Sequence, residues 1–75
     1  MGSPAPEVQY LYDWLRDEFR RHPEVMIRIR PAQEADGVSV RTPAREYFFE
    51  TEWVREKRFD RVSGLASQIL DLLER

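Results

Sequence analysis

Few side chains of this 75-residue sequence have the chemistry that catalysis needs. Its one histidine, His22, precedes Pro23 and could act as a general base or as a charged cap at a helix end. With no second histidine and no cysteine, nucleophilic triads lack their usual members, so we expect a cap. The three glycines, at positions 2, 37 and 64, are too scattered to form a phosphate-binding loop.

A pair of carboxylates, Glu50 and Glu52, has the spacing of one face of a β-strand, where two acids could bind a metal ion or exchange protons. Three basic residues, here called the sheet arginines, are predicted on that same face: Arg28, Arg30 and Arg41. Cross-strand ion pairs therefore explain the acids better than metal or acid–base chemistry does. We expect no catalytic residue, no metal, no cofactor and no enzymatic activity.

Basic side chains are concentrated in the segment 55–61, REKRFDR, around one aromatic ring, Phe59. Such interleaving can hold phosphates while the ring stacks on a base. The basic members are Arg55, Lys57, Arg58 and Arg61. Two acids dilute the charge, and Phe59 can pack beneath the following helix, so a solvated connection is the other interpretation. The alternative function is thus a nucleic-acid-binding module that uses this segment and the sheet arginines.

The elements that position these side chains follow from the spacing of apolar residues. One stripe with spacings of three and four predicts a helix over residues 6–22, which Pro23 ends. Its members are Val8, Leu11, Tyr12, Leu15 and Phe19. A second stripe predicts a C-terminal helix with Asp60 or Ser63 as its N-cap. That stripe consists of Val62, Leu65, Ala66, Ile69, Leu72 and Leu73.

Between the helices, residues alternate with a period of two in three stretches, 25–30, 38–41 and 47–53, which predicts three strands. Asp36-Gly37 and Thr42-Pro43-Ala44 have the composition of turns, because glycine tolerates a positive φ and proline presets its own. Connections this short exclude parallel crossovers. A helix over residues 46–60 is the competing interpretation, but the Tyr-Phe-Phe run and the threonine favour a strand.

The predicted fold class is therefore α+β: a helix, a three-stranded antiparallel meander and a helix (αβββα), with both helices packed on one face of the sheet. We expect one domain over residues 1–75, with residues 1–5 disordered. The net charge is −2, and no apolar run approaches the roughly 20 residues of a membrane helix. No membrane partner is expected, and the absence of cysteine agrees with a cytoplasmic location.

The sheet face away from the helices is the first candidate surface. It is predicted to carry Met26, Arg28, Arg30, Ser39, Arg41, Phe48, Glu50 and Glu52. A partner or a second copy of the chain would remove Met26 and Phe48 from water. Alternatively, the two are scattered apolar residues on a solvated face, which is common in antiparallel sheets.

The first helix carries the second candidate surface. Tyr10 and Trp14 lie to one side of its apolar stripe, and Arg21 continues that side. Tyrosine, tryptophan and arginine are enriched in interaction hot spots, although Trp14 can also pack against a neighbouring helix. The function that we expect is a non-catalytic protein–protein interaction or regulatory domain. Its partner would be another protein or a second copy of the chain, with no small-molecule substrate.

The predicted element order resembles that of the double-stranded-RNA-binding domain. That family opens its second helix with a lysine cluster on the RNA phosphates and reaches a minor groove with the loop between its first two strands. Here the second helix opens DRVSGLASQ, with one arginine and no lysine, and the loop is the acidic PAQEADG. The resemblance covers element order alone and implies no RNA-binding site.

Overall fold

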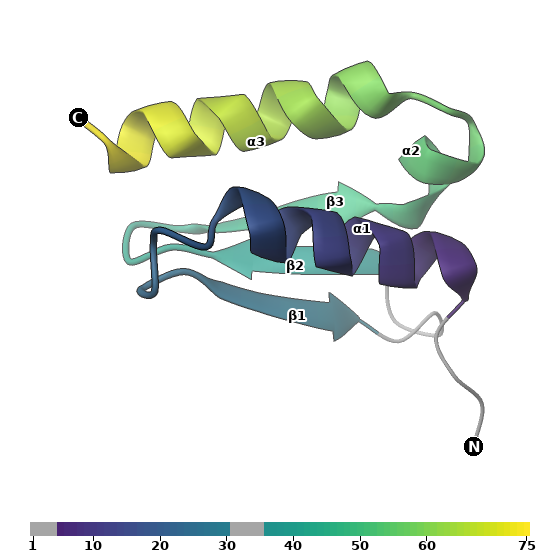
Figure 1. Ribbon diagram of the computed structural model, residues 1–75, viewed down its shortest axis with the longest axis horizontal. Helices are drawn as coiled ribbons and strands as arrows, with labels where there is room; N and C mark the ends of the chain where they lie inside the picture. Colours follow the sequence, from purple (N-terminus) through teal and green to yellow (C-terminus); the bar gives the residue numbers. More distant parts are fainter. Residues whose placement is uncertain (1–4, 31–35) are drawn as a thin grey trace.

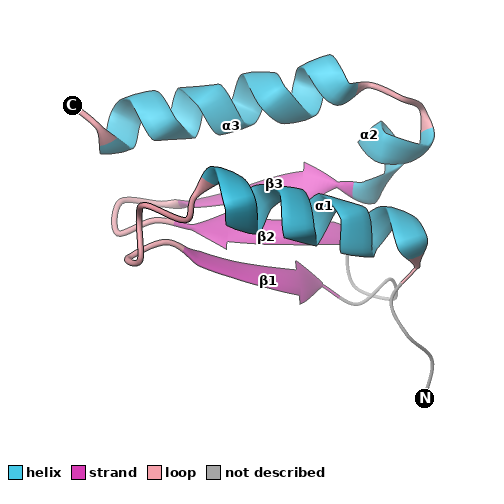
Figure 2. Ribbon diagram, in the orientation of Figure 1, coloured by secondary structure: helices cyan, strands magenta, loops and turns pink. Residues whose placement is uncertain are grey.

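The computed structural model describes residues 5–30 and 36–75. The elements, in chain order, are α1 (Pro6–Glu18), β1 (Met26–Arg30), β2 (Gly37–Arg41), β3 (Glu46–Glu50), α2 (Thr51–Arg55) and α3 (Phe59–Leu73) (Figure 1). The strands form one antiparallel sheet in the order β1-β2-β3. Figure 2 shows α1 and α3 side by side on one face, α1 across β1 and β2 and α3 along the β3 side. The predicted α+β arrangement is confirmed, with α2 as an addition.

The hydrophobic core lies between this sheet face and the two long helices. Its buried members are Val8, Leu11, Leu15, Phe19, Val38, Val40, Phe49, Val62, Ala66 and Ile69. The three buried residues of α1 and its C-cap Phe19 belong to the stripe that the sequence predicts, because residues three and four apart share one helix face. The strand members alternate with residues of the open face, since successive side chains of a strand point to opposite sides.

Helix α1 is shorter than the predicted range of 6–22, because it ends at Glu18 and Phe19 is its C-cap. Phe19 is buried, and its carbonyl accepts a hydrogen bond from the backbone N–H of His22 at 2.9 Å. The chain therefore turns toward the sheet before it reaches Pro23. At the other end, Ala5 is partly buried against the core, although the sequence analysis assigns it to a disordered start. Residues 1–4 lie outside the described residues.

The third strand ends earlier than predicted, because residues 51–55 form the one-turn helix α2. The last link between β2 and β3 is the bond from the Thr51 N–H to the Asp36 carbonyl, at 2.9 Å. Beyond it, Trp53 packs edge-on against Phe49, with ring centroids 6.1 Å apart. Glu52 therefore lies on a helix and not on the open sheet face. The alternation of Thr51 and Trp53 with acidic residues predicts a strand, and this prediction is wrong. Packing of Trp53 on the core favours a turn of helix instead.

The end of α2 is stabilised by its own backbone. Lys57 has a φ of 57°, the left-handed conformation, and its N–H donates to the Val54 carbonyl at 3.1 Å. The Arg58 N–H reaches back to the Trp53 carbonyl at 2.7 Å. These two bonds form a Schellman motif, which closes a helix and redirects the chain. Helix α3 then begins directly at Phe59 with Arg58 as its N-cap, so the predicted caps Asp60 and Ser63 are wrong.

The two predicted turns have different outcomes. Thr42 closes the β2–β3 turn, because its hydroxyl donates to the Arg45 carbonyl at 2.9 Å and accepts from the Ala44 and Arg45 N–H groups. Gly37, by contrast, is the first residue of β2, pairs with Arg30 and Glu50, and has no positive φ. Its assignment to a turn is therefore wrong, and residues 31–35 of the predicted connection lie outside the described residues.

Candidate functional site

A shallow groove between α1 and the first turn of α3 brings three aromatic side chains together. The rings of Tyr10 and Phe59 meet edge to face, with centroids 6.1 Å apart and an interplanar angle of 66°. Trp14, one turn after Tyr10, lines the same hollow, whose volume is about 270 Å³. Tyr10, Trp14 and Phe59 are here called the aromatic groove. Val62, Ser63 and the carboxylate of Asp60 complete its lining.

Exposure of the aromatic groove follows from the positions of its members on the two helices. Tyr10 lies two residues after buried Val8 and stays 52% exposed, because it points away from the core stripe. Phe59 starts α3 and is 45% exposed. Trp14 is half-buried and packs against the core, yet it still forms part of the groove. The site therefore has a fixed floor and two accessible rings.

The sequence predicts two separate surfaces, one formed by Tyr10 with Trp14 and the other by Phe59 with its basic neighbours. The structure joins their aromatic members, because α1 and α3 run alongside each other and start at the same end of the domain (Figure 1). The expectation that Phe59 packs beneath the last helix is wrong, since it lies on the helix side that faces Tyr10. Two helical stripes predict helices but not which flanks touch, so the pattern contains no direct signal for this contact.

Arg21, the third predicted member of the Tyr10 surface, lies elsewhere. It follows the end of α1 and is exposed beside Leu70 and Glu74, at the opposite end of the two helices from Phe59. A helix that continued to residue 22 would have placed Arg21 in line with Trp14. Because α1 ends at Glu18, this alignment is wrong.

The basic segment 55–61 is partly neutralised by acids. The Arg55 guanidinium donates to a carboxylate oxygen of Asp36 at 2.7 Å, which links α2 to the start of β2. This hydrogen bond holds the pKa of Asp36 below its ordinary value and raises the pKa of Arg55. Arg58 lies 3.3 Å from a carboxylate oxygen of Glu56. Lys57 and Arg61 remain as exposed cations, and Lys57 is held in place by the Schellman motif.

The sheet arginines do not join this segment. Arg28 and Arg41 are exposed on the open face, and Arg30 is half-buried there. The connection from α2 to α3 lies in the helix layer, on the other side of the sheet (Figure 1). One nucleic-acid strand would have to pass around an edge of the sheet to contact both groups. The structure thus separates the two parts of the predicted nucleic-acid site.

Among the described residues, the open face carries no continuous apolar patch. Met26 is 60% exposed on the edge strand β1, whereas Phe48 is half-buried on the opposite edge strand β3. The β2 residue opposite Phe48 is Ser39, which is buried between its neighbours, and Met26 is opposite Arg41. Two strand spacings, about 10 Å, and an offset of two residues along the strands therefore separate the two apolar side chains. They do not form one surface that a flat partner would cover.

The residues considered for catalysis, His22, Glu50 and Glu52, do not come together in one site. The ring nitrogens of His22 lie 3.8 Å from a carboxylate oxygen of Glu24 and 3.5 Å from one of Glu74, so the imidazole bridges the loop after α1 and the end of α3. Glu50 and Glu52 do not share a face, because Glu52 belongs to α2. Within the described residues there is no group of three or more acids or histidines arranged to hold a metal ion. None of their helices is long and apolar enough to cross a membrane.

Comparison of the chain with protein-family models, with curated proteins and with solved structures finds no match. The assignment of a function therefore depends on the geometry of the groove and the surfaces around it.

Proposed function

We propose that this chain is a non-catalytic protein-interaction domain that binds a partner protein through the aromatic groove. The observation that carries the proposal is the pair of rings from Tyr10 and Phe59, each about half exposed, above a hollow that also includes Trp14. Burial of such rings removes a large apolar area from water, and aromatic side chains dominate interface hot spots. The groove would accept an apolar side chain of the partner.

The size of the protein strengthens this argument. A domain of 75 residues has a total stability of only about 4–11 kcal/mol, so rings that stay outside the core are apolar area that folding does not use. The rest of the surface gives the groove contrast, because charged residues make up 35% of the chain. An apolar hollow with a charged surround is typical of a specific interface.

The test is a comparison of proteins recovered from a lysate by the immobilised wild-type chain and by two variants, Tyr10→Ala and Met26→Ala. Met26 is a matched control, since it is similarly exposed, at 60% against 52% for Tyr10, but lies on the open sheet face. We expect a specific partner to lose about tenfold or more in affinity with Tyr10→Ala and little with Met26→Ala. The reverse result would move the interface to the open face and overturn the proposal.

Salt dependence and size separate the remaining alternatives. Binding to an apolar groove should change little with salt, whereas binding to nucleic acid must weaken steeply. Light scattering of the purified chain over a range of concentrations would detect a homodimer. A dimer that dissociates in the Tyr10→Ala variant would identify a second copy of the chain as the partner of this groove.

A further inference from the structure

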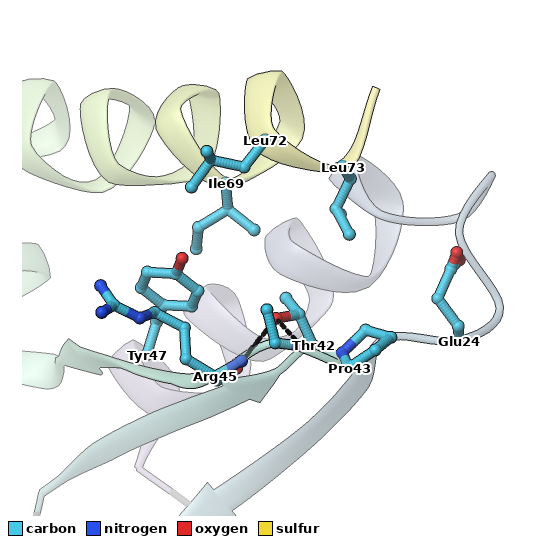
Figure 3. Close-up of a pocket in the computed structure, with 9 residues that line it drawn as sticks. Glu24, Thr42, Pro43, Arg45, Tyr47, Ile69, Leu72 and Leu73 are labelled. Carbon is cyan, nitrogen blue, oxygen red and sulfur yellow. Dashed lines mark hydrogen bonds between the residues drawn. The ribbon is translucent and has the colours of Figure 1, made fainter. Parts of the chain in front are cut away.

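A second cleft lies on the opposite flank of α3, between the end of that helix and the beginning of β3. Figure 3 shows Tyr47 pointing from the sheet toward α3, with Ile69 and Leu73 pointing back toward the sheet. Leu72 completes the helix wall and is 51% exposed. The cleft formed by Tyr47, Ile69, Leu72 and Leu73, with Glu24 and residues 42–45 completing its lining, is here called the β3 cleft. Its volume of about 630 Å³ lies within the range of binding pockets.

The β3 cleft adjoins an edge strand with outward-facing backbone groups. Thr42 donates from its N–H to the Arg45 carbonyl at 2.8 Å, and Thr51 to the Asp36 carbonyl at 2.9 Å. Hydrogen-bonded pairs alternate along an antiparallel ladder, so these two bonds identify Val40–Tyr47 and Val38–Phe49 as the bonded pairs between them.

The β3-side residues that lie between Arg45, Tyr47 and Phe49 must therefore direct their N–H and C=O groups away from β2. They are Glu46 and Phe48, at the free edge of the sheet. Within residues 5–30 and 36–75, no turn, loop or cap hydrogen bond of the backbone ends on their N–H or C=O groups. This edge can pair with an added strand, the arrangement known as β-augmentation.

An added strand would place its side chains alternately on the two sides of the sheet. The residue opposite Tyr47 would point to the helix side and enter the β3 cleft, where an apolar side chain would cover Leu72. The residues beside it would lie on the open face, opposite Glu46 and Phe48. The backbone edge and the cleft thus fit one ligand, a segment in extended conformation.

Charge selects among the segments that could pair there. Glu46 and Glu50 are exposed on the open-face side of β3, on either side of Phe48. A second copy that paired its own β3 along the whole strand would place Glu46 opposite Glu50, and like charges opposite each other are destabilising. Basic side chains on the added strand, opposite Glu46 and Glu50, would be favourable. We propose that the β3 edge and the β3 cleft bind an extended segment of a partner protein in which basic residues alternate with an apolar residue.

The probe is a blocked, fluorescent peptide of sequence Arg-Leu-Arg-Leu-Arg, titrated into the full chain. Fluorescence anisotropy measures its affinity, and NMR amide shifts locate it. We expect the largest shifts at Glu46 and Phe48 and at Leu72. A peptide of the same sequence with every backbone nitrogen methylated keeps the charge but has no N–H group to donate to the β3 edge, and a Glu-Leu-Glu-Leu-Glu peptide reverses the charge. Both should bind at least about fivefold more weakly.

Variants of the protein provide the matched controls. Leu72→Gln removes an apolar wall at an exposed helix position, and Glu46→Lys reverses one charge at the edge. Each should weaken the Arg-Leu peptide by about fivefold, whereas Glu52→Lys, the same charge change on α2, should change affinity less than about twofold. Glu46 and Glu52 are both exposed, so the Glu46→Lys and Glu52→Lys variants should both fold.

Three results would overturn the proposal. Equal binding of the N-methylated peptide would show that attraction is electrostatic without strand pairing. Shifts confined to Tyr10, Trp14 and Phe59 would place the ligand in the aromatic groove, which the proposed function concerns. Concentration-dependent dimerisation of the free chain with shifts at Glu46 and Phe48 would identify a second copy as the occupant.

Discussion

The ring of Phe48 lies over the backbone of Gly37 on the open face of the sheet. A Cβ atom built at position 37 would be 2.5 Å from the Cζ atom of that ring and would also collide with the Phe49 carbonyl oxygen. An aromatic ring on a neighbouring strand thus covers the surface that glycine leaves bare. Phe48 therefore has a structural role, which reduces its value as a free contact residue.

We expect Gly37→Ala to destabilise the domain, because the colliding carbonyl belongs to the sheet backbone and cannot rotate away. Overpacking of this kind typically costs about 1–3 kcal/mol. Urea unfolding followed by circular dichroism would measure the change. An unchanged midpoint would mean that β2 and β3 can separate locally at no cost.

Gly64→Ala should have the opposite sign. Gly64 lies within α3, and a Cβ atom at this position would meet no described atom within 4 Å beyond its chain neighbours and the backbone of its own helix. Alanine is favoured over glycine in a helix by about 0.5–1 kcal/mol, since glycine has more backbone freedom to lose on folding. The unfolding midpoint should therefore rise, and a decrease would contradict the exposed position of this residue.

Lys57→Gly should also stabilise the fold, by up to about 1 kcal/mol, because glycine adopts the left-handed conformation of this position without the steric cost of a side chain. The same substitution removes a cation from the basic segment. Unfolding measurements at high salt would isolate the conformational part. Destabilisation there would indicate that the Lys57 side chain supports the turn.

Leu15→Ala and Tyr10→Ala test the division of α1 into a core side and a groove side. Leu15 is fully buried and its truncation should cost about 2–5 kcal/mol, whereas the loss for the half-exposed Tyr10 should be much smaller. Thermal unfolding of the two variants gives the comparison. Equal losses would mean that the Tyr10 ring is required for folding and is not reserved for a partner.

The Asp36–Arg55 contact predicts a pH dependence of stability. The pKa of Asp36 is lowered in the folded chain by the Arg55 hydrogen bond, so the ionised carboxylate favours folding. This contribution is complete above the ordinary aspartate pKa of about 3.9 and is lost as pH falls through the lower folded value. The free energy of unfolding should decrease less on acidification in Asp36→Asn than in the wild type. High salt should reduce the difference, because both side chains are partly exposed.

Sequence periodicity was sufficient to predict which residues are buried where the geometry of a single helix sets which of them share a face. Four members of the predicted stripe, Val8, Leu11, Leu15 and Phe19, are buried and the fifth, Tyr12, is partly buried, because helix geometry alone sets which residues share a face. Prediction failed where contacts with residues distant in the sequence decide the local secondary structure. Residues 51–55 alternate like a strand, but the last β2–β3 bond is at Thr51 and Trp53 packs on Phe49, so the segment turns into α2.

The candidate sites divide in the same way. From the sequence alone, Tyr10 could be assigned to the exposed flank of a helix and basic residues to the segment before α3. That Phe59 meets Tyr10, and that Glu46 and Phe48 direct their backbone groups to a free edge beside Leu72, depends on which elements lie next to each other. Local sequence determined the elements and their apolar faces, because these depend on helix and strand periodicity. Tertiary structure decided the surfaces, because a groove or an edge exists only between elements that are distant in the chain.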